Sequence, residues 1–276
     1  MFDTNYYCLV AGLREYSLDG GAKGFDPHAI LDEILRELTP RDLRAVRLLY
    51  GYYDCKNLIA LRAGSPAHDP LGNFARERLK EETEHPRLLP HAIGLVLAAY
   101  ARPDGEEAEE VDTSRPFEQA LFEAYYGLCA ASPSRFLREW SDFDRTLRNV
   151  AAATTRAAGR PVDGHVVGND DVAEQLRRSS ASDFGLRGEL PYIDAVIAAV
   201  NDESNLLEKE HKIDRIRWQQ AVDLAAEDYF NVNAVLSYLV RINLVARWTQ
   251  LDEARGRAML GRLLRELDGK ELINNK

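Results

Sequence analysis

Two Glu-x-x-His motifs contain the residues of this chain whose types and spacing could do metal chemistry. Glu82 and His85 form the first motif, and Glu208 and His211 form the second. Residues three apart share one face of a helix, so each motif would present a carboxylate and an imidazole together. Two such motifs with two further glutamates build a di-iron carboxylate site inside a helical bundle. A di-iron enzyme is therefore one hypothesis for this chain.

The neighbours of both motifs favour a different interpretation. Pro86 directly follows His85, and helices usually end at or before the residue that precedes a proline. The ligands of a bundle must project from continuous helices, so the first motif is badly placed. The second motif belongs to a polar stripe that is typical of a solvent-facing helix side. That stripe comprises Glu208, His211, Lys212, Arg215 and Gln219, opposite Leu206, Ile213 and Ile216. We expect no metal and no cofactor, and the di-iron enzyme remains the alternative.

Other catalytic arrangements are missing from the sequence. No glycine-rich phosphate loop is followed by Lys-Ser or Lys-Thr, so the usual device for nucleotide hydrolysis is absent. Cys8, Cys55 and Cys129 lack zinc-type spacing, and no serine lies in a nucleophile elbow. The remaining histidines without partners at helical spacing are His28, His68, His91 and His165. We expect a non-catalytic protein with no small-molecule substrate.

The composition excludes several classes of partner. The 276 residues carry a net charge of -10, and no basic stripe is available to neutralise phosphates. Binding to nucleic acid or to anionic lipid is therefore not expected. The longest apolar run, from Ala92 to Ala101, is too short to cross a bilayer, and Met1 to Asn5 have no basic flank. Three cysteines without motif spacing suit a reducing compartment. We expect a cytoplasmic protein with protein partners and no direct membrane insertion.

The elements that must position any site are predicted to be helices almost throughout. Helix starts are indicated by a capping residue followed by proline. Such pairs are Asp26-Pro27, Thr39-Pro40, Asp69-Pro70 and Ser132-Pro133. Apolar residues at helical spacing follow the first two pairs and extend over 117–128, 136–156, 192–200, 206–248 and 254–267. Residues 6–13 could form a short strand or a helix. The predicted fold class is all-α.

Two loops divide this helical pattern. Arg102 to Arg115 contains Pro103, Gly105 and a run of acids, and Gly159 to Asn169 contains Pro161 and three glycines. The predicted organisation is a first helical unit at 1–101, a second at 116–160 that continues to about 200, and a third at 201–276. One continuous domain is the alternative.

The segment from Tyr53 to Ala63 places polar side chains where a helix should be apolar. Tyr50, Tyr53, Asn57 and Leu61 lie three or four residues apart, so Asn57 falls inside the core-facing stripe. A buried amide without hydrogen-bond partners costs about 1–3 kcal/mol. The alternative is that Asn57 lies at the edge of the stripe and reaches water.

This arrangement is echoed twice further along the chain. In each echo an aromatic residue precedes an asparagine, and a helix of small or apolar residues then reaches an arginine. The echoes are Phe143-Asp144 with Asn149 and Arg156, and Tyr229-Phe230 with Asn233 and Arg241. The asparagines are about ninety residues apart, which is long enough for a repeated helical unit. The match is loose, since Asn231 stands where an aspartate is expected, and chance similarity between amphipathic helices is the alternative.

With these motifs the chain resembles the C subunit (subunit d in eukaryotes) of V-type and archaeal-type rotary ATPases. The resemblance rests on the Tyr-rich segment from Tyr6 to Arg14, on the Asp-x-x-Asn-Leu-x-x-Leu-Arg-Ala motif from Asp54 to Ala63, and on Leu207-Glu208 with Asp214. Only the second of these is specific. The chain is most similar to an uncharacterised bacterial family that looks like a shortened C subunit and accompanies V-type ATPase genes.

The resemblance implies three related helical units arranged as a funnel, and a non-catalytic adaptor role. Such a subunit sits on the membrane rotor ring, and its funnel receives the tip of the central shaft. The implied partners are the rotor shaft subunits and the rotor ring of a V-type ATPase, which would hold the protein peripheral to the membrane. The chain is shorter than many members, and the loop at 159–169 interrupts its middle unit.

Candidate residues for lining the funnel or binding a partner are polar residues of the three repeated segments and an Arg-Trp pair. Cations and aromatic residues are enriched at binding surfaces. The alternatives are exposed helix residues for the arginines, a half-buried structural tryptophan, and a helical scaffold unrelated to any ATPase. The candidates are Asp54, Asn57, Arg62, Arg156, Asn233, Arg241, Arg247 and Trp248.

Overall fold

The computed structural model describes residues 4–20, 24–102, 110–161, 165–202 and 205–250, and all of their regular structure is helical. This confirms the predicted all-α fold class. The described helices are α1 (Tyr7–Gly12), α2 (Pro27–Glu37), α3 (Pro40–Arg62), α4 (Arg76–Glu84), α5 (His91–Ala101), α7 (Phe117–Ala130), α8 (Arg135–Ala157), α9 (Asp171–Arg178), α10 (Ile193–Asn201), α11 (Leu206–Leu224) and α12 (Val232–Gln250).

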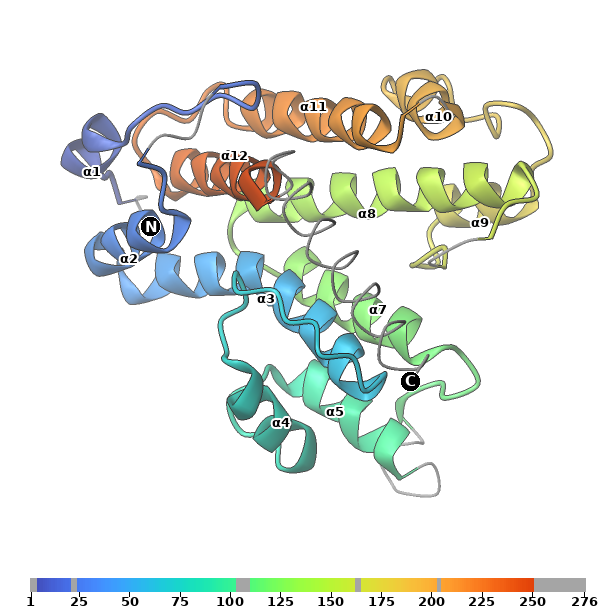
Figure 1. Ribbon diagram of the computed structural model, residues 1–276, viewed down its shortest axis with the longest axis horizontal. Coiled ribbons are helices and arrows are strands. Elements are labelled where there is room, and N and C mark those ends of the chain that lie inside the picture. The colour runs from blue at the N-terminus through green and yellow to red at the C-terminus, as the bar shows by residue number, and fades with distance from the viewer. Residues whose placement is uncertain (1–3, 21–23, 103–109, 162–164, 203–204, 251–276) are drawn as a thin grey trace, which may run out of the picture.

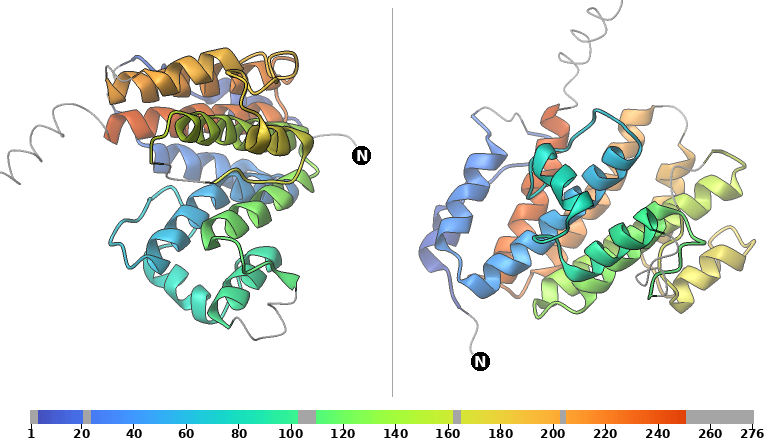
Figure 2. Two further views of the ribbon diagram at one scale, coloured as in Figure 1. Left: turned by 90° about the vertical axis from the view of Figure 1, so that its right-hand side faces the viewer. Right: turned by 90° about the horizontal axis from the view of Figure 1, so that it is seen from below.

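Helix α8 lies at the centre of the molecule and contacts α7, α9, α10, α11 and α12. Figure 1 shows α10 and α11 on one side of α8, with α3 and α7 on the other and α4 and α5 farther out. The side view in Figure 2 shows the same stack of layers. One hydrophobic core runs through them and includes Leu58 of α3, Leu121 of α7, Leu147 of α8 and Leu236 of α12. These four helices therefore share one core.

The two longest helices, α3 and α8, begin and end by the same means. The Thr39 side chain accepts a hydrogen bond from the backbone N–H of the third helical residue of α3, and Ser134 does the same for α8. At the other end, Gly64 and Gly159 both have φ of +67°. This left-handed conformation favours glycine and ends a helix. Local sequence thus sets the length of both helices at 23 residues.

Two of the four predicted helix starts are confirmed and two are corrected. Pro27 and Pro40 begin α2 and α3 as expected. No helix follows Asp69, because its carboxylate accepts a hydrogen bond from the Leu71 N–H in a tight turn, and α4 begins only at Arg76. Helix α8 begins at Arg135, since the capping side chain is Ser134 and not Ser132.

The predicted continuous helix at 206–248 is wrong, because the chain turns between α11 and α12. The Asn231 side chain accepts hydrogen bonds from the backbone N–H groups of Asn233 and Ala234, at 3.0 and 3.3 Å. This is the geometry of a helix N-cap, so a new helix starts here. Residues 6–13, left open between strand and helix, contain the short helix α1.

The predicted helices at 117–128, 136–156 and 192–200 are confirmed by α7, α8 and α10. The short helices α4 and α9 lack a long apolar stripe, so periodicity does not predict them. The pattern at 254–267 lies outside the described residues. Among the helices that the structure describes, none is both long enough and apolar enough to cross a membrane.

Candidate functional site

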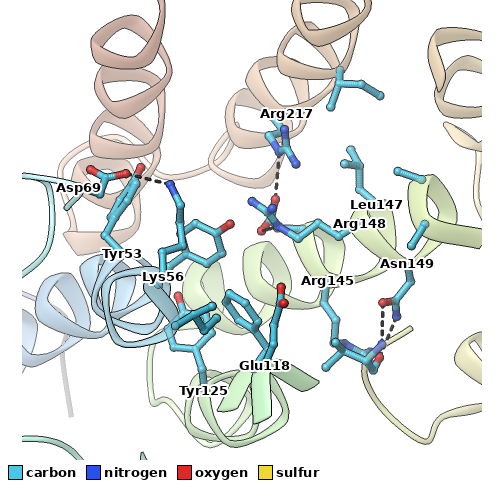
Figure 3. Close-up of a pocket in the computed structure, with 18 of the residues that line it drawn as sticks. Tyr53, Lys56, Asp69, Glu118, Tyr125, Arg145, Leu147, Arg148, Asn149 and Arg217 are labelled. Carbon is cyan, nitrogen blue, oxygen red and sulfur yellow. Dashed lines mark hydrogen bonds and ion pairs between the residues drawn. The ribbon is translucent and has the colours of Figure 1, made fainter. Parts of the chain in front are cut away.

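A wide cavity of about 1060 Å³ lies between α3, α7, α8, α11 and α12. Small side chains leave room in it: Ala60 on α3, Ala63 just after the end of α3, and Ala151 and Ala152 on α8 all line the cavity. Figure 3 shows aromatic and charged side chains from several helices pointing into the same space. The cavity is the candidate functional site of the described residues.

A chain of ion pairs forms the wall of the cavity between α8, α11 and α12. Arg148 Nε lies 2.7 Å from Asp144 Oδ2, and Arg217 Nε lies 3.0 Å from Asp144 Oδ1. Asp214 continues the chain, because its two oxygens lie 2.9 Å from Arg217 Nη1 and 2.7 Å from Arg247 Nη1. We call these five residues the arginine–aspartate network. It ties three helices together through side chains.

The two carboxylates of the network are buried, and each lies between two guanidinium groups. Burial alone would raise the pKa of Asp144, but attraction to Arg148 and Arg217 outweighs burial and holds it at about 2. Asp144 therefore stays ionised at neutral pH, which does not suit a general acid or base. Breaking such a pair leaves a buried charge without compensation. The network fixes the wall and is not arranged for proton transfer.

Aromatic side chains attach the network to the rest of the cavity. The Tyr126 hydroxyl of α7 donates to Asp144 Oδ2 at 3.3 Å, and Trp248 Nε1 donates to Asp214 Oδ2 at 2.9 Å. The guanidinium of Arg148 lies 4.5 Å from the centre of the Tyr52 ring on α3, a cation–π distance. All five helices around the cavity are thus connected.

Asn57 and Asn149 make the same pair of hydrogen bonds to the loop that follows their helix. Asn57 Nδ2 donates to the Asp69 carbonyl at 2.9 Å, and the Asp69 N–H donates to Asn57 Oδ1 at 2.7 Å. Asn149 does the same to Val167, with both distances 2.8 Å. Both asparagines are 2% exposed. We call this arrangement the asparagine clasp. It is a structural tie within the chain, and neither amide is free for a partner.

Both clasped loops need a glycine close to the clasp. A Cβ atom on Gly72 would lie 2.8 Å from Asn57 Nδ2 and 2.8 Å from Asp54 Oδ1, which is too close for any carbon contact. Gly168 has φ of +100°, a conformation that side chains other than glycine rarely adopt. The loops after α3 and α8 are therefore built alike in their hydrogen bonds and in their glycine.

Asp54 lies one turn before Asn57 and is also buried, at 4% exposure. Asn73 Nδ2 donates to its Oδ2 at 2.6 Å, and the Phe74 N–H donates to its Oδ1 at 3.3 Å. Burial raises the pKa of Asp54 to about 6, although these hydrogen bonds act in the opposite direction. Asp54 holds the loop that leads to α4 and does not face the cavity.

Asn233 does not make a clasp. It is the second residue of α12, where its Oδ1 accepts from Ser134 Oγ at 3.1 Å and its Nδ2 donates to Asp228 at 3.1 Å. It therefore ties the start of α12 to the start of α8. The matching residue is Asn243, which lines the cavity and accepts a hydrogen bond from the Tyr50 hydroxyl at 3.0 Å. Asn243-Leu244-Val245-Ala246 repeats Asn57-Leu58-Ile59-Ala60 almost residue by residue.

Comparison with known proteins places the chain in a family. Residues 3–270 match the family model described as "Protein of unknown function (DUF2764)". The chain belongs to this family. No curated protein and no solved structure matches it. The function of this DUF2764 protein must therefore be argued from its cavity and surfaces.

Three of the predicted arginines do not line the cavity. The guanidinium of Arg62 stacks 4.7 Å from the Phe117 ring centre, and Arg156 donates to a carbonyl of α9 at 3.2 Å. Arg241 pairs with Glu15 at 3.2 Å. These arginines hold neighbouring segments of the DUF2764 chain together. Their side chains are exposed or half-buried, and their role in lining a funnel or binding a partner stays a prediction.

Arg247 is the predicted residue that does line the cavity, and Trp248 supports it from the adjacent position. The sequence motifs do not single out Arg148 and Arg217, although both residues lie in segments that are predicted to be helical. The available signal is spacing, because Asp144 and Arg148 are four apart and Asp214 and Arg217 are three apart. Such pairs lie on one helix face.

The Glu-x-x-His motifs do not form a common site. Glu82 is 1% exposed, and its Oε2 accepts from the backbone N–H groups of Arg87 and Leu88 at 2.7 and 2.8 Å. It thus stabilises the turn after α4, which ends before His85 as Pro86 predicts. His211 Nε2 lies 2.8 Å from Asp19 Oδ1. Within the described ranges no three His, Cys, Asp or Glu side chains lie together as metal ligands would.

Proposed function

We propose that this DUF2764 protein is a non-catalytic adaptor of the central stalk of a V-type rotary ATPase, and that its cavity receives the tip of the rotor shaft. The cavity is the main observation that supports this proposal. Its volume of about 1060 Å³ is at the upper limit of the roughly 300–1,000 Å³ of small-molecule sites. Side chains of five helices line it, which supports a polypeptide segment and not a small molecule as its occupant.

The charges that line the cavity suit a subunit that must stay in solution before it is assembled with its partners. Six basic and five acidic side chains line it, so the lining is nearly neutral although the whole protein carries a net charge of -10. A cavity with charged groups avoids a large exposed apolar patch. The lining charges are Lys56, Arg145, Arg148, Lys209, Arg217 and Arg247, and Asp69, Glu118, Asp144, Glu210 and Asp214.

The rigidity of the wall suits a part that transmits torque. A coupling subunit must not open locally under load, and low-stability regions are those with few buried contacts. In this protein the arginine–aspartate network joins α8, α11 and α12, and the asparagine clasps fix the loops after α3 and α8. The Asp54 to Ala63 motif, which carries the resemblance to the C subunit, therefore has a structural explanation.

Filling the cavity tests the proposal. The variant Ala152→Trp places a large side chain in the lining of α8, whereas Ala157→Trp makes the same change at an exposed position near the end of that helix, outside the cavity. Binding of each full-length variant to purified rotor shaft subunits is measured by biolayer interferometry, with circular dichroism as a fold check. We expect Ala152→Trp to weaken binding at least tenfold and Ala157→Trp to bind like wild type. Wild-type protein that does not bind the shaft would overturn the proposal in favour of an unrelated scaffold.

A further inference from the structure

The cavity is lined by aromatic side chains as well as by charges. Figure 3 shows Tyr53 and Tyr125 among the side chains that surround it. Aromatic rings offer a large apolar surface with a defined shape, so they favour an occupant that brings apolar side chains of its own. The aromatic residues of the lining come from α3, α7 and α8, and they are Tyr52, Tyr53, Phe122, Tyr125, Tyr126 and Trp140.

Two charges of the lining have no ion pair with any residue that the structure describes. They are Glu118 of α7 and Lys209 of α11, and both side chains are half-buried. The other charged side chains of the lining already form ion pairs, among them Lys56 with Asp69. A half-buried carboxylate is stabilised when a cation approaches it. Glu118 therefore suits an occupant that brings a cation into the cavity.

The segment that follows α12 has the sequence of such an occupant. Residues 251–276 lie outside the described residues, and their apolar pattern predicts a helix at 254–267. The family model extends to residue 270, so this pattern belongs to the matched region of the chain. A helix with one apolar face needs an apolar surface to cover that face. The face is formed, at the i, i+3, i+4 and i+7 positions, by Leu260, Leu263, Leu264 and Leu267.

The charge and the size of this segment also suit the cavity. Residues 254–265 contain four arginines and no acidic residue, whereas the whole chain carries a net charge of -10. Arg257 lies three residues before Leu260, so on a helix it borders the leucine face and could reach Glu118. With a helix diameter of about 10 Å and a rise of about 1.5 Å per residue, a volume of about 1060 Å³ holds about nine residues of helix. The four leucines span eight residues.

The segment begins at the cavity. Arg247 and Gln250 belong to the last turn of α12, and both line the cavity. Five extended residues span at most about 17 Å, so residues 251–255 are long enough to lead the chain back over the lining. Gly256 is suited to the turn that this path requires, because glycine adopts conformations that other residues avoid. A turn there leaves all four leucines on a helix at 257–267, which we call the leucine segment.

We propose that the leucine segment docks as a helix in the cavity of its own chain, with its leucines against the aromatic lining and Arg257 near Glu118. The docked segment covers apolar surface that would otherwise meet water. It also regulates the proposed function, because the tip of the rotor shaft must displace the segment before it can enter. This competition rests on the proposed function, whereas the docking of the segment does not.

Hydrogen–deuterium exchange of the full-length protein tests the docking. Ala152→Trp fills the cavity from α8, and Ala157→Trp makes the same change at an exposed position outside the lining. Glu118→Lys reverses the unpaired charge, and its matched control is Glu77→Lys at an exposed position of α4 that is also outside the lining. Exchange of the amides of residues 258–267 is followed by mass spectrometry. Circular dichroism checks that each variant keeps its fold.

In wild type we expect these amides to exchange at least tenfold more slowly than in a free peptide of residues 251–276. An isolated helix of this length is marginal in water, so slow exchange reports docking and not helix propensity. Ala152→Trp should abolish the protection, because the new ring takes the space of the leucines. Glu118→Lys should lower it at least threefold, whereas Ala157→Trp and Glu77→Lys should exchange like wild type. Addition of purified rotor shaft to wild type should also remove the protection.

Three results would contradict the docking. The amides of wild type could exchange as fast as those of the free peptide, or their protection could survive in Ala152→Trp, which would place the segment elsewhere. If Ala152→Trp fails the fold check, unchanged protection in Glu118→Lys contradicts the docking instead. Protection that falls when wild type is diluted would assign the cavity to the segment of a second copy of the chain.

The same measurements separate this inference from the proposed function. Protection that Ala152→Trp abolishes, in a wild-type protein that does not bind the shaft, would uphold the docking and overturn the adaptor role. Shaft binding by wild type, together with protection that survives in Ala152→Trp, would uphold the adaptor role and overturn the docking. Shaft binding that leaves the segment protected would show that the two do not compete for the cavity.

Discussion

Asn57 and Asn149 show why a polar side chain can be retained inside an apolar helix stripe. Each amide satisfies both backbone groups of one loop residue, at distances of 2.7 to 2.9 Å. A buried backbone group without a partner is costly, so a loop that packs against a helix needs such a substitute. The side chain that looks misplaced along the helix is what allows the loop to pack there.

Replacing either asparagine by leucine should destabilise the protein. Asn149→Leu leaves the Val167 N–H and carbonyl without their partners, which we expect to lower the free energy of unfolding by about 1–3 kcal/mol. Asn57→Leu should lower the free energy of unfolding by a similar amount, because it leaves the Asp69 N–H and carbonyl without their partners. The measurement is urea denaturation followed by circular dichroism. Asn169→Leu, an exposed position in the same loop as Val167, should change stability by less than about 0.5 kcal/mol. Unchanged stability of Asn57→Leu with weaker shaft binding would instead mean that the amide serves a partner.

Asp54 should make stability depend on pH between about 4 and 6. Its pKa is raised by burial from 3.8 to about 6 in the folded protein. A carboxyl whose pKa is higher in the folded protein stabilises the fold fully at pH values below its pKa in the unfolded chain. This stabilisation is lost as pH rises through its pKa in the folded protein. The shift of about two units corresponds to about 3 kcal/mol. Asp144 acts in a different window, because its lowered pKa of about 2 affects stability only below about pH 4.

The test compares wild type with Asp54→Asn by urea denaturation from pH 4 to pH 7. As pH rises from 4 to 6, the unfolding free energy of wild type should fall relative to that of Asp54→Asn. Above pH 6 the difference between the two proteins should stay constant. Titrations shared by both proteins cancel in this difference. A difference that stays constant from pH 4 to pH 7 would show that the Asp54 carboxyl is not raised in pKa.

At the scale of elements, the long helices could be predicted from sequence and their connections could not. N-cap side chains set the starts of α3 and α8, and glycines set their ends, so the signals for both helices are local in the sequence. The sequence does not predict the break between α11 and α12, because apolar residues continue at helical spacing through Ala225 and Ala226. The spacing places Asn57 inside the core-facing stripe and leaves its exposure to water open, but it does not predict the partner Asp69, since a hydrogen bond to a loop backbone leaves no pattern in the sequence.

The arginine–aspartate network makes α8, α11 and α12 depend on one another. Arg217 lies between Asp144 and Asp214, so Arg217→Met leaves two buried carboxylates with one guanidinium less. We expect a loss of about 3–5 kcal/mol in the free energy of unfolding, measured by urea denaturation. Arg215→Met on the same helix removes a pair with Asp19 in which both side chains are about 60% exposed. Its effect should stay below about 0.5 kcal/mol, because exposed ion pairs contribute little. Equal effects of the two substitutions would show that the network is not structural.

At the scale of the whole molecule, two units share one construction. A long helix, a clasped loop, a short helix and a helix of 9 or 11 residues follow one another in α3–α4–α5 and again in α8–α9–α10. Helix α12 repeats the Asn-Leu-x-Ala segment of α3 at Asn243, and a third unit around α12 stays a prediction. The Tyr50 hydroxyl of α3 donates to Asn243 at 3.0 Å, so α3 directly contacts the repeated segment of α12. The cavity forms where the long helices α3, α8 and α12 converge with α7 and α11.

Native-state hydrogen exchange should show whether this convergence behaves as one rigid body. Amides in the middle of α8 and α12 lie in the shared core, so we expect their opening free energies to equal the global unfolding free energy and to agree within about 1 kcal/mol. Helix α4 buries only Leu79 and Glu82 among its residues and should open at a lower free energy. The measurement is hydrogen–deuterium exchange with mass spectrometry in increasing urea. Opening of α12 several kcal/mol below α8 would mean that the cavity wall yields before the molecule unfolds. A wall of that kind could not hold a turning shaft, and the adaptor proposal would lose its physical basis.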